Sequence, residues 1–418
     1  DKLQTILQYI EGEYVDHIDG DSLLEAVLPD LLTSLDPHSV YIPASDFKAV
    51  NEELEGSFSG IGISFNMLTD TISVIEIISG GPAEAVGLLP GDRIITINDS
   101  VAAGKGWSSE KVITQLRGPK GSKVKVGVKR DSSKELLEFE LTRDDIAVNS
   151  IDASYMIDDD TGYIRVNKFG RTTFDEFFVD AVTLLNEGAE NLIIDLRGNG
   201  GGYMEMAIAM ANEFLPEGAE IVSTRGRRKS NNRTEKADGL GRLKEVGLTV
   251  LMDEYSASAS EIFAGAIQDN DRGLVIGRRS FGKGLVQQQY VLPDSSAIRL
   301  TIARYYTPSG RSIQKTYEHG GTKAYQEDLI QRYDRGEMFN ADSVKLDMSF
   351  KFFTGTGREV YGGGCIMPDI FVPADTTGVT SYYLQAANKG ELQKFAFDYN
   401  DKHRKTLSQA QSVAELLK

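Results

Sequence analysis

The sequence Asn191-Leu-Ile-Ile-Asp-Leu-Arg-Gly-Asn-Gly-Gly-Gly202 holds the pattern that decides the fold. Its first six residues are a short apolar run typical of a buried strand, a glycine-rich loop follows, and residues 205–214 have helical apolar spacing. The same alternation continues on both sides, with strands predicted at 162–166, 248–252 and 274–277 and helices at 173–186 and 260–268. This order predicts an α/β core with a largely parallel sheet.

The rest of the chain has a different pattern of apolar residues. Residues 56–143 contain short β-rich runs at 61–65, 72–78, 93–97, 124–129 and 136–141, with helical spacing at 109–116, which predicts a small β-rich domain. Both chain ends contain helix formers. We therefore expect four regions: an N-terminal helical region (1–55), the β-rich domain (56–145), the α/β core (146–375) and a C-terminal helical region (376–418).

Composition excludes several classes of function. The 418 residues carry 62 acidic and 45 basic side chains, a net charge of −17 that opposes binding to nucleic acid. Cys365 is the single cysteine, so an intrachain disulfide and a cysteine-based zinc or iron–sulfur site are excluded. No apolar run is long enough for a membrane span. Because the chain starts at Asp1 without a signal peptide, we expect a processed form that has lost an export signal or a membrane tether.

The first candidate catalytic group is a serine in the loop after the strand at 248–252. Ser258 lies where this small-residue loop enters a helix, which places a hydroxyl beside exposed backbone N–H groups. Ser258 and Glu261 also fit a capping box, a purely structural arrangement. The four histidines, at positions 17, 38, 319 and 403, all lie outside residues 144–314, which disfavours a Ser-His-Asp triad.

Lys283 is the alternative base, in the glycine-rich loop after the next strand. Burial there would lower its pKa, so that a neutral amine accepts the serine proton; a surface cation is the simpler interpretation. The run from Gly277 to Gly284 also resembles a phosphate-binding loop, but Gly284 lacks the required hydroxyl and no strong helix formers follow. A helical S-x-x-K signature at Ser280 and Lys283 is disfavoured by the flanking glycines. The glycines at 198–202 suit an oxyanion donor or a flexible turn.

Five motifs in this order resemble the C-terminal processing peptidases, also called tail-specific proteases, of serine peptidase family S41. They are Asp195-Leu-Arg197 with its glycines, Ser256-Ala-Ser-Ala-Ser260-Glu261, Phe281-Gly-Lys-Gly284 with Val286-Gln287, Tyr306-Thr-Pro-Ser-Gly-Arg311, and Gly363-Gly-Cys-Ile-Met-Pro-Asp369. The resemblance spans roughly residues 35–373. It implies a ClpP/crotonase-like α/β protease core, and the sequence departs from it at Gly200, often a proline, and at Cys365.

The resemblance also implies roles for particular residues. Ser258 would be the nucleophile, Lys283 the general base and Gln287 the support of the lysine. The oxyanion hole would be formed by the amides of Ala259 and of Gly201 or Gly202. No metal and no cofactor is implied.

The β-rich segment resembles an inserted PDZ domain. Gly60-Ile61-Gly62-Ile63 would be its carboxylate-binding loop and edge strand, with apolar residues of 109–116 lining the side-chain pocket. Arg117 corresponds to an arginine implicated in coupling this domain to the active site, and a structural arginine is the alternative.

We therefore expect a periplasmic or cell-envelope, extracytoplasmic serine endopeptidase. It would use a Ser-Lys dyad on proteins or peptides with free C-termini or unstructured segments, and the PDZ domain would bind the substrate C-terminus or gate the site. The terminal helical regions would form a homodimer or close the core. The alternatives are a catalytically silent PDZ scaffold, which the presence of Ser258, Lys283 and Gln287 disfavours, and an NTPase.

Overall fold

The computed structural model describes residues 2–68, 70–130, 133–317, 322–345 and 349–407, with 409 and 415. His319, one of the four histidines, lies outside them. The chain divides into two compact units, one formed by residues 1–56 and 149–374 and the other by residues 57–148 and 375–418. The chain therefore passes between the units three times.

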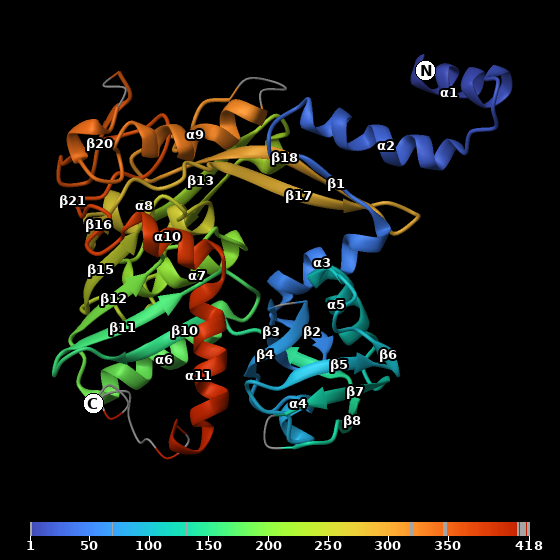
Figure 1. Ribbon diagram of the computed structural model, residues 1–418. Helices are drawn as coiled ribbons and strands as arrows, with labels where there is room; N and C mark the ends of the chain where they lie inside the picture. The colour runs from blue at the N-terminus through green and yellow to red at the C-terminus, as the bar shows by residue number, and fades with distance from the viewer. Residues whose placement is uncertain are drawn as a thin grey trace. The chain divides into compact units, whose positions relative to one another are not determined.

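The first unit is built on the predicted largely parallel sheet (Figure 1). Five neighbouring strands run parallel and one edge strand is antiparallel. In sheet order they are β10 (Ile151–Met156), β11 (Thr161–Val166), β12 (Asn191–Asp195), β15 (Gly247–Met252), β16 (Leu274–Gly277) and β21 (Ile370–Phe371). The helices that follow the strands are α6 (Thr173–Glu187), α7 (Met204–Phe214) and α8 (Ala259–Asp269). The strand and helix alternation predicted from the sequence is confirmed.

Apolar residues of this sheet and its helices form one continuous core. Ile164, Ile194 and Val250 lie on neighbouring strands and are fully buried, and they pack with Phe177 of α6 and Phe263 of α8. Every residue of α8 is buried. α8 is therefore enclosed on all sides although it carries polar residues at both ends, so the helix after the serine loop has a fixed position.

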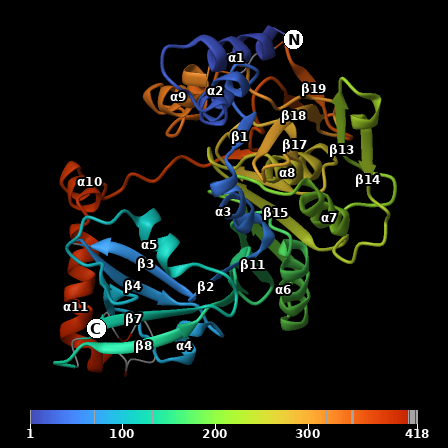
Figure 2. The same cartoon turned by 90° about the vertical axis from the view of Figure 1, so that its right-hand side faces the viewer.

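A second sheet in the same unit was not predicted. Its strands pair in the order β1 (Val40–Ile42), β18 (Ala297–Tyr306), β13 (Glu220–Gly226) and β14 (Arg233–Lys236), and β17 (Leu285–Val291) also pairs with β18. Figure 2 labels β13 and β14, which form a hairpin. The unit also contains α1 (Lys2–Glu13), α2 (Gly20–Thr33), α3 (Ala44–Glu55), α9 (Thr322–Asp334), η1 (Lys229–Asn231), η2 (Ala341–Ser343), β19 (Lys351–Phe353) and β20 (Glu359–Tyr361).

The second unit contains the β-rich domain. Its main sheet has the order β3 (Ile63–Leu68), β4 (Thr71–Ile77), β5 (Arg93–Ile97), β7 (Lys123–Lys129) and β8 (Leu137–Thr142), with β6 (Ser100–Val101) beside β5. β2 (Ser57–Gly60) pairs with β9 (Asp144–Ala147). The helices are α4 (Pro82–Ala85) and α5 (Ser109–Leu116). The five predicted strands and the predicted helix are confirmed, and β3 is an edge strand of the sheet.

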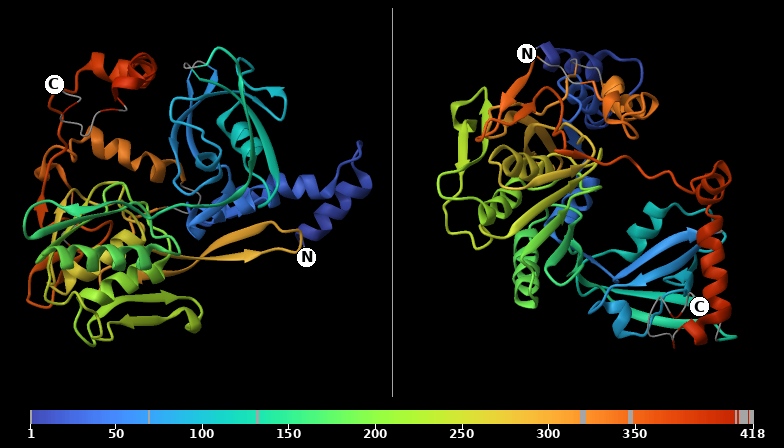
Figure 3. Two further views of the ribbon diagram at one scale, coloured as in Figure 1. Left: turned by 90° about the horizontal axis from the view of Figure 1, so that it is seen from below. Right: turned by 90° about the vertical axis from the view of Figure 1, so that its left-hand side faces the viewer.

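The C-terminal helices belong to the second unit. They are α10 (Ser381–Asn388) and α11 (Glu391–Leu407). The Arg404 guanidinium of α11 lies against Gly91, where a Cβ atom would come within 2.3 Å of its Nη2. In the right-hand view of Figure 3, α11 is the long red helix beside the strands of this unit. Gly91 has a φ of +86°, so a side chain at this position would be strained as well as too close to the helix.

Neither a membrane span nor a metal cluster is found in the described parts of the chain. No described helix combines the length and the apolar character that crossing a membrane would need. Within the described residues, His, Cys, Asp and Glu side chains form no group of three or more arranged to hold a metal ion.

Candidate active site

Three loops meet at one edge of the parallel sheet. β12, β15 and β16 are neighbours with parallel register, so the loops that follow them leave from the same side. These loops carry the glycine run after β12, Ser258 after β15 and Lys283 after β16. The carboxyl ends of parallel strands are where α/β proteins place their functional groups. The predicted proximity of the three loops is confirmed.

Ser258 has an unusual backbone conformation at the start of α8. Its φ is +57° and its ψ is −112°, a combination that costs a non-glycine residue about 1–3 kcal/mol. The surrounding contacts hold it there, because its N–H donates to Glu261 Oε2 (2.9 Å) and its carbonyl accepts from the amides of Glu261 (2.9 Å) and Ile262 (3.0 Å). The capping-box pattern noted in the sequence is present. These contacts hold a strained serine at the N-terminus of α8.

The two neighbouring serines are occupied by structural contacts. Ser256 Oγ donates to the carbonyl of Leu196 (2.8 Å), and Ser260 Oγ donates to the carbonyl of Asn199 (2.9 Å). Both side chains are fully buried. The Ser258 hydroxyl, by contrast, donates to no described residue. Of the three serines, Ser258 is the one whose proton is available for transfer.

Lys283 is held by a chain of hydrogen bonds that reaches the N-terminal part of the unit. Its Nζ donates to Gln287 Oε1 (3.1 Å), and Gln287 Nε2 donates to the carbonyl of His38 (2.6 Å). Burial lowers the pKa of Lys283, and the charge of Arg299 lowers it further. Among the described residues Nζ makes no hydrogen bond to Ser258, and catalytic hydrogen bonds are often long before substrate binds.

Glu261 connects the serine loop and the lysine loop. Its Oε2 accepts from the amides of both Ser258 (2.9 Å) and Lys283 (2.9 Å). Its Oε1 accepts from the Ser280 hydroxyl (2.5 Å) and the Gly282 amide (2.7 Å). All four contacts are donors, so the buried group is a carboxylate, although burial raises its pKa. Sequence reasoning assigned Glu261 only to a helix cap, and its neighbours in the lysine loop are visible only in three dimensions.

Tyr305 makes a second connection between the two loops. Its hydroxyl lies 3.0 Å from the carbonyl oxygen of Ser258 and 2.5 Å from that of Lys283. The side chain is buried, which raises its pKa well above the usual value and keeps the phenol neutral. Sequence reasoning missed this residue, since it precedes the Tyr306–Arg311 motif by one position.

The glycine loop approaches Ser258 closely. A Cβ atom on Gly201 would lie 2.7 Å from Ser258 Cβ and 3.0 Å from the Ala259 nitrogen, and its φ is +103°. The Gly201 amide donates to Asn199 Oδ1 (2.8 Å). No described acceptor takes the amides of Ala259 and Gly202. Of the three predicted oxyanion residues, Gly201 is the one whose amide has an acceptor, and it lies against Ser258 and Ala259.

α9 covers the lysine loop through a buried polar and aromatic cluster. Tyr325 Oη lies 2.8 Å from His38 Nε2, and its ring lies 4.0 Å from Lys315 Nζ. Lys315 Nζ also lies 3.9 Å from the ring of Phe281. Arg332 of α9 donates to the carbonyls of Ser280 and Arg279, at 2.9 and 2.6 Å. The loop carrying Lys283 is followed by β17, not by a helix, so the phosphate-binding and S-x-x-K interpretations lack their required helix.

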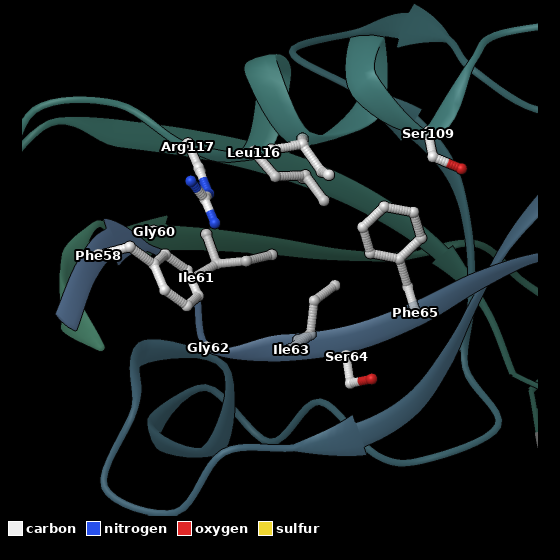
Figure 4. Close-up of a pocket in the computed structure, with 11 residues that line it drawn as sticks. Phe58, Gly60, Ile61, Gly62, Ile63, Ser64, Phe65, Ser109, Leu116 and Arg117 are labelled. Carbon is white, nitrogen blue, oxygen red and sulfur yellow. The ribbon is translucent and has the colours of Figure 1, made fainter. Parts of the chain in front are cut away.

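The second unit has a separate groove of about 280 Å³ between the edge strand β3 and α5. In Figure 4 the side chains of Ile61, Ile63 and Leu116 point into the same space. The predicted loop residues Gly60, Ile61, Gly62 and Ile63 all line it, as do Ser109, Ile113 and Leu116 of α5. At its border the Arg117 guanidinium lies 4.3 Å from the ring centroid of Phe58.

Comparison with known proteins identifies both units. Residues 160–323 match the model of peptidase family S41, and residues 59–141 match the model of the PDZ domain. The carboxy-terminal-processing protease of Bartonella bacilliformis is 37% identical over 74% of this chain and 71% of its own length. The chain therefore belongs to the carboxy-terminal processing proteases, which are serine peptidases of family S41. The family expected from the sequence is confirmed.

Two further proteins are similar over most of the chain. Carboxy-terminal processing protease CtpB of Bacillus subtilis is 32% identical over 84% of this chain and 72% of its own length. A solved structure of the photosystem II D1 C-terminal processing protease is 27% identical, covers 74% of this chain and 89% of that chain, and has a TM-score of 0.42.

Proposed function

We propose that this peptidase cleaves polypeptides with a dyad of Ser258 and Lys283. One observation supports the proposal most strongly: a single carboxylate oxygen of Glu261 accepts the amides of both residues, which fixes their backbones relative to each other. The lowered pKa of Lys283 supplies a neutral amine, and the helix N-terminus at Ser258 favours the negative charge of an oxyanion.

The mechanism follows from these positions. Ser258 Oγ attacks the substrate carbonyl carbon while Lys283 Nζ takes its proton. The amides of Ala259 and Gly202 donate to the oxyanion that forms. The protonated lysine then gives its proton to the leaving amine, which departs and leaves an acyl-serine. In the second half, the neutral lysine takes a proton from water while the resulting hydroxide attacks the acyl carbon. The bond from this carbon to Ser258 Oγ then breaks, the carboxyl product leaves, and the protonated lysine returns its proton to Ser258 Oγ. Gln287 accepts from Nζ and orients it toward the serine.

The PDZ groove would capture the substrate. An extended peptide adds a strand to the edge of β3, its terminal carboxylate binds the backbone amides at residues 60–63, and its last side chain enters the apolar space beside α5. Arg117 lies at the border of this groove, where it is placed to sense an occupant and to gate the site. Substrates would thus be proteins with free C-termini or unstructured segments.

The dyad is tested by substitution at its two members. Ser258→Ala and Lys283→Ala should each abolish hydrolysis of a peptide substrate and remain folded, since nucleophile and base act as a unit. Labelling with a fluorophosphonate should also be lost in Ser258→Ala. For the wild type, kcat/KM should rise with pH through the lowered pKa of Lys283, because only the neutral amine accepts a proton.

Lys283→Arg is the matched control for charge. A guanidinium keeps the positive charge but stays protonated in proteins, so this variant should be inactive at every pH. Substantial turnover by Lys283→Arg would remove the lysine from the role of base.

Two further proposals concern the oligomeric state of the enzyme and its location in the cell. The terminal helical regions carry exposed apolar side chains, among them Tyr9, Val15, Tyr382 and Phe395, which supports a homodimer through these regions. Light scattering on the protein with and without residues 375–418 tests this. Placement in the periplasm or cell envelope, with a membrane tether, is tested by fractionating cells that produce the protein from its own gene.

A further inference from the structure

A group of basic side chains on the β13–β14 hairpin has no role in the proposed chemistry. Arg225, Arg227, Arg228 and Lys229 occur within five residues, and no acidic residue occurs from position 221 to position 234. This is unusual in a chain with a net charge of −17. We call Arg225, Arg227, Arg228, Lys229 and Arg304 the basic ribbon.

The cations of the basic ribbon are exposed, and none of them forms an ion pair with a described residue. Arg225 lies directly opposite Arg304 in the antiparallel pairing of β13 and β18. Like charges opposite each other in a sheet destabilise it. The repulsion between these two arginines therefore destabilises the free protein locally. An anionic ligand bound to both would replace this repulsion with attraction.

Contacts fix Arg225 and the backbone of the turn that follows it. The Arg225 guanidinium lies 4.5 Å from the ring centroid of Tyr306. The turn that follows is fixed by Asn231, whose Nδ2 donates to the carbonyl of Ile302 (3.2 Å), and by Asn232, whose Oδ1 accepts from the Gly226 amide (2.7 Å). Side chains on an ordered turn bind carboxylates with less loss of conformational entropy than side chains on a disordered loop.

The basic ribbon lies on the same sheet as β17, the strand that carries Gln287, the hydrogen-bond partner of Lys283. Arg304 pairs with Arg225 on one side and with Leu285 on the other, and Leu285 is two residues after Lys283. Neighbouring strands lie about 4.8 Å apart, so Arg225 is about 10 Å from the backbone of β17. The turn anchored at Ile302 lies next to the Thr301–Gln287 pair. A polypeptide that reaches Gln287 therefore comes within reach of the ribbon.

We propose that the basic ribbon binds an acidic stretch of the polypeptide substrate, next to the segment that is cleaved. The inference rests on the proposed function, because it names a substrate feature for the same site. Its chemistry is recognition of Asp and Glu carboxylates by arginine, and it predicts selectivity for substrates with acidic flanks that weakens as salt increases.

The test compares two peptides that differ only in a flanking stretch of four glutamates or four glutamines. The ratio of their kcat/KM values, acidic over neutral, should fall about tenfold in Arg227→Gln/Arg228→Gln/Lys229→Gln and in the wild type at high salt. Lys48→Gln/Arg165→Gln/Lys323→Gln removes the same charge from exposed positions elsewhere in this unit and should keep the wild-type ratio. An unchanged ratio in the ribbon variant would overturn the proposal.

A binding measurement separates this proposal from the dyad assignment. Fluorescence anisotropy with the Ser258→Ala protein should show tighter binding of the acidic peptide, and the three ribbon substitutions should remove that preference. If the wild type cleaves neither peptide but this preference is present, the proposed peptidase function is wrong, whereas the binding of acidic peptides by the basic ribbon is supported. If the ribbon variant keeps the preference but loses co-sedimentation with phosphatidylglycerol vesicles, the ribbon binds lipid and the inference is wrong.

Discussion

Glu261 shows, at the scale of single residues, what the sequence could and could not predict. Ser258 and Lys283 were predicted because a hydroxyl at a helix start and a lysine after the next strand are local patterns. Glu261 was seen only as a cap, because its contacts with Ser280, Gly282 and Lys283 join positions about twenty residues apart. A local pattern cannot show which loop a buried carboxylate will reach.

Replacing Glu261 by glutamine should impair catalysis more than folding. The amide NH₂ group of the new side chain would face N–H donors, which should shift the loops and lower kcat by about 10²-fold. The charge of Glu261 raises the pKa of Lys283, so its loss should move the acid limb of the residual activity to lower pH. A pH–rate profile measures both effects. An unshifted limb would mean that Glu261 acts on the fold alone.

The three neighbouring serines should separate catalysis from stability. Ser256→Ala and Ser260→Ala each remove a buried hydrogen bond to a carbonyl that keeps a backbone donor, so each should lower the free energy of unfolding by about 0.5–1.5 kcal/mol and keep peptidase activity. Ser258→Gly should be inactive, yet more stable than Ser258→Ala, because glycine adopts a positive φ without strain. Urea denaturation and peptide hydrolysis measure the two properties. Loss of catalysis in Ser256→Ala at full stability would contradict the assignment.

At the scale of elements, the parallel sheet was predictable and the second sheet was not. The strands of the parallel sheet alternate with helices, and that regular order is a strong signal. β1 and β13 pair with β18 across long sequence separations. β17 and β18 form a hairpin, but β17 is a mixed run of Leu, Val and glutamine without a clear alternation. α9 escaped prediction for a similar reason: its buried face, with Tyr325 and Arg332, is polar rather than apolar. The second sheet and α9 both position the loop that carries Lys283.

The contact between His38, in the turn before β1, and α9 should make stability depend on pH. Burial and the charges of Lys283 and Lys315 lower the pKa of His38 to about 4, against the opposing effect of Asp36, and Tyr325 Oη occupies its Nε2. An unfolded histidine binds a proton near pH 6.5, so between pH 6.5 and 4 the unfolded state binds more protons. Stability should therefore fall as the pH decreases through this window.

Chemical denaturation of His38→Gln between pH 4 and 7 measures this effect. The variant should show a smaller decrease in stability than the wild type. His17→Gln alters an exposed histidine of the same unit and serves as the control. If the His38 variant kept the wild-type slope, another group would be responsible for the acid sensitivity.

At the scale of the whole molecule, the sequence predicted a protease core and a PDZ domain, and both family models match. It did not show that the C-terminal helices form a compact unit with the PDZ domain. That grouping depends on contacts such as Arg404 with Gly91, which lie more than three hundred residues apart. Deleting the PDZ domain would therefore also expose the face of α11 that lies against it, and point substitutions are the cleaner test.

Ile113→Asp is such a substitution. It places a carboxylate in the apolar groove, where it should repel a terminal carboxylate, and kcat/KM for a protein with a free apolar C-terminus should fall about tenfold. A short internal peptide should be cleaved as before. Val101→Asp, on an exposed position of β6 outside the groove, is the matched control. Equal losses on both substrates would assign Ile113 to the fold rather than to capture.

The three chain crossings between the units have a consequence for a nicked molecule. Residues 375–380 form the third crossing and are exposed. A single cut there would leave the peptidase core and the PDZ domain in one covalent chain, because the other two crossings remain. The fragment with α10 and α11 would then be a noncovalent subunit, and its retention would depend on protein concentration. Dilution of nicked enzyme would strip off the C-terminal helices and leave the catalytic and peptide-binding parts joined.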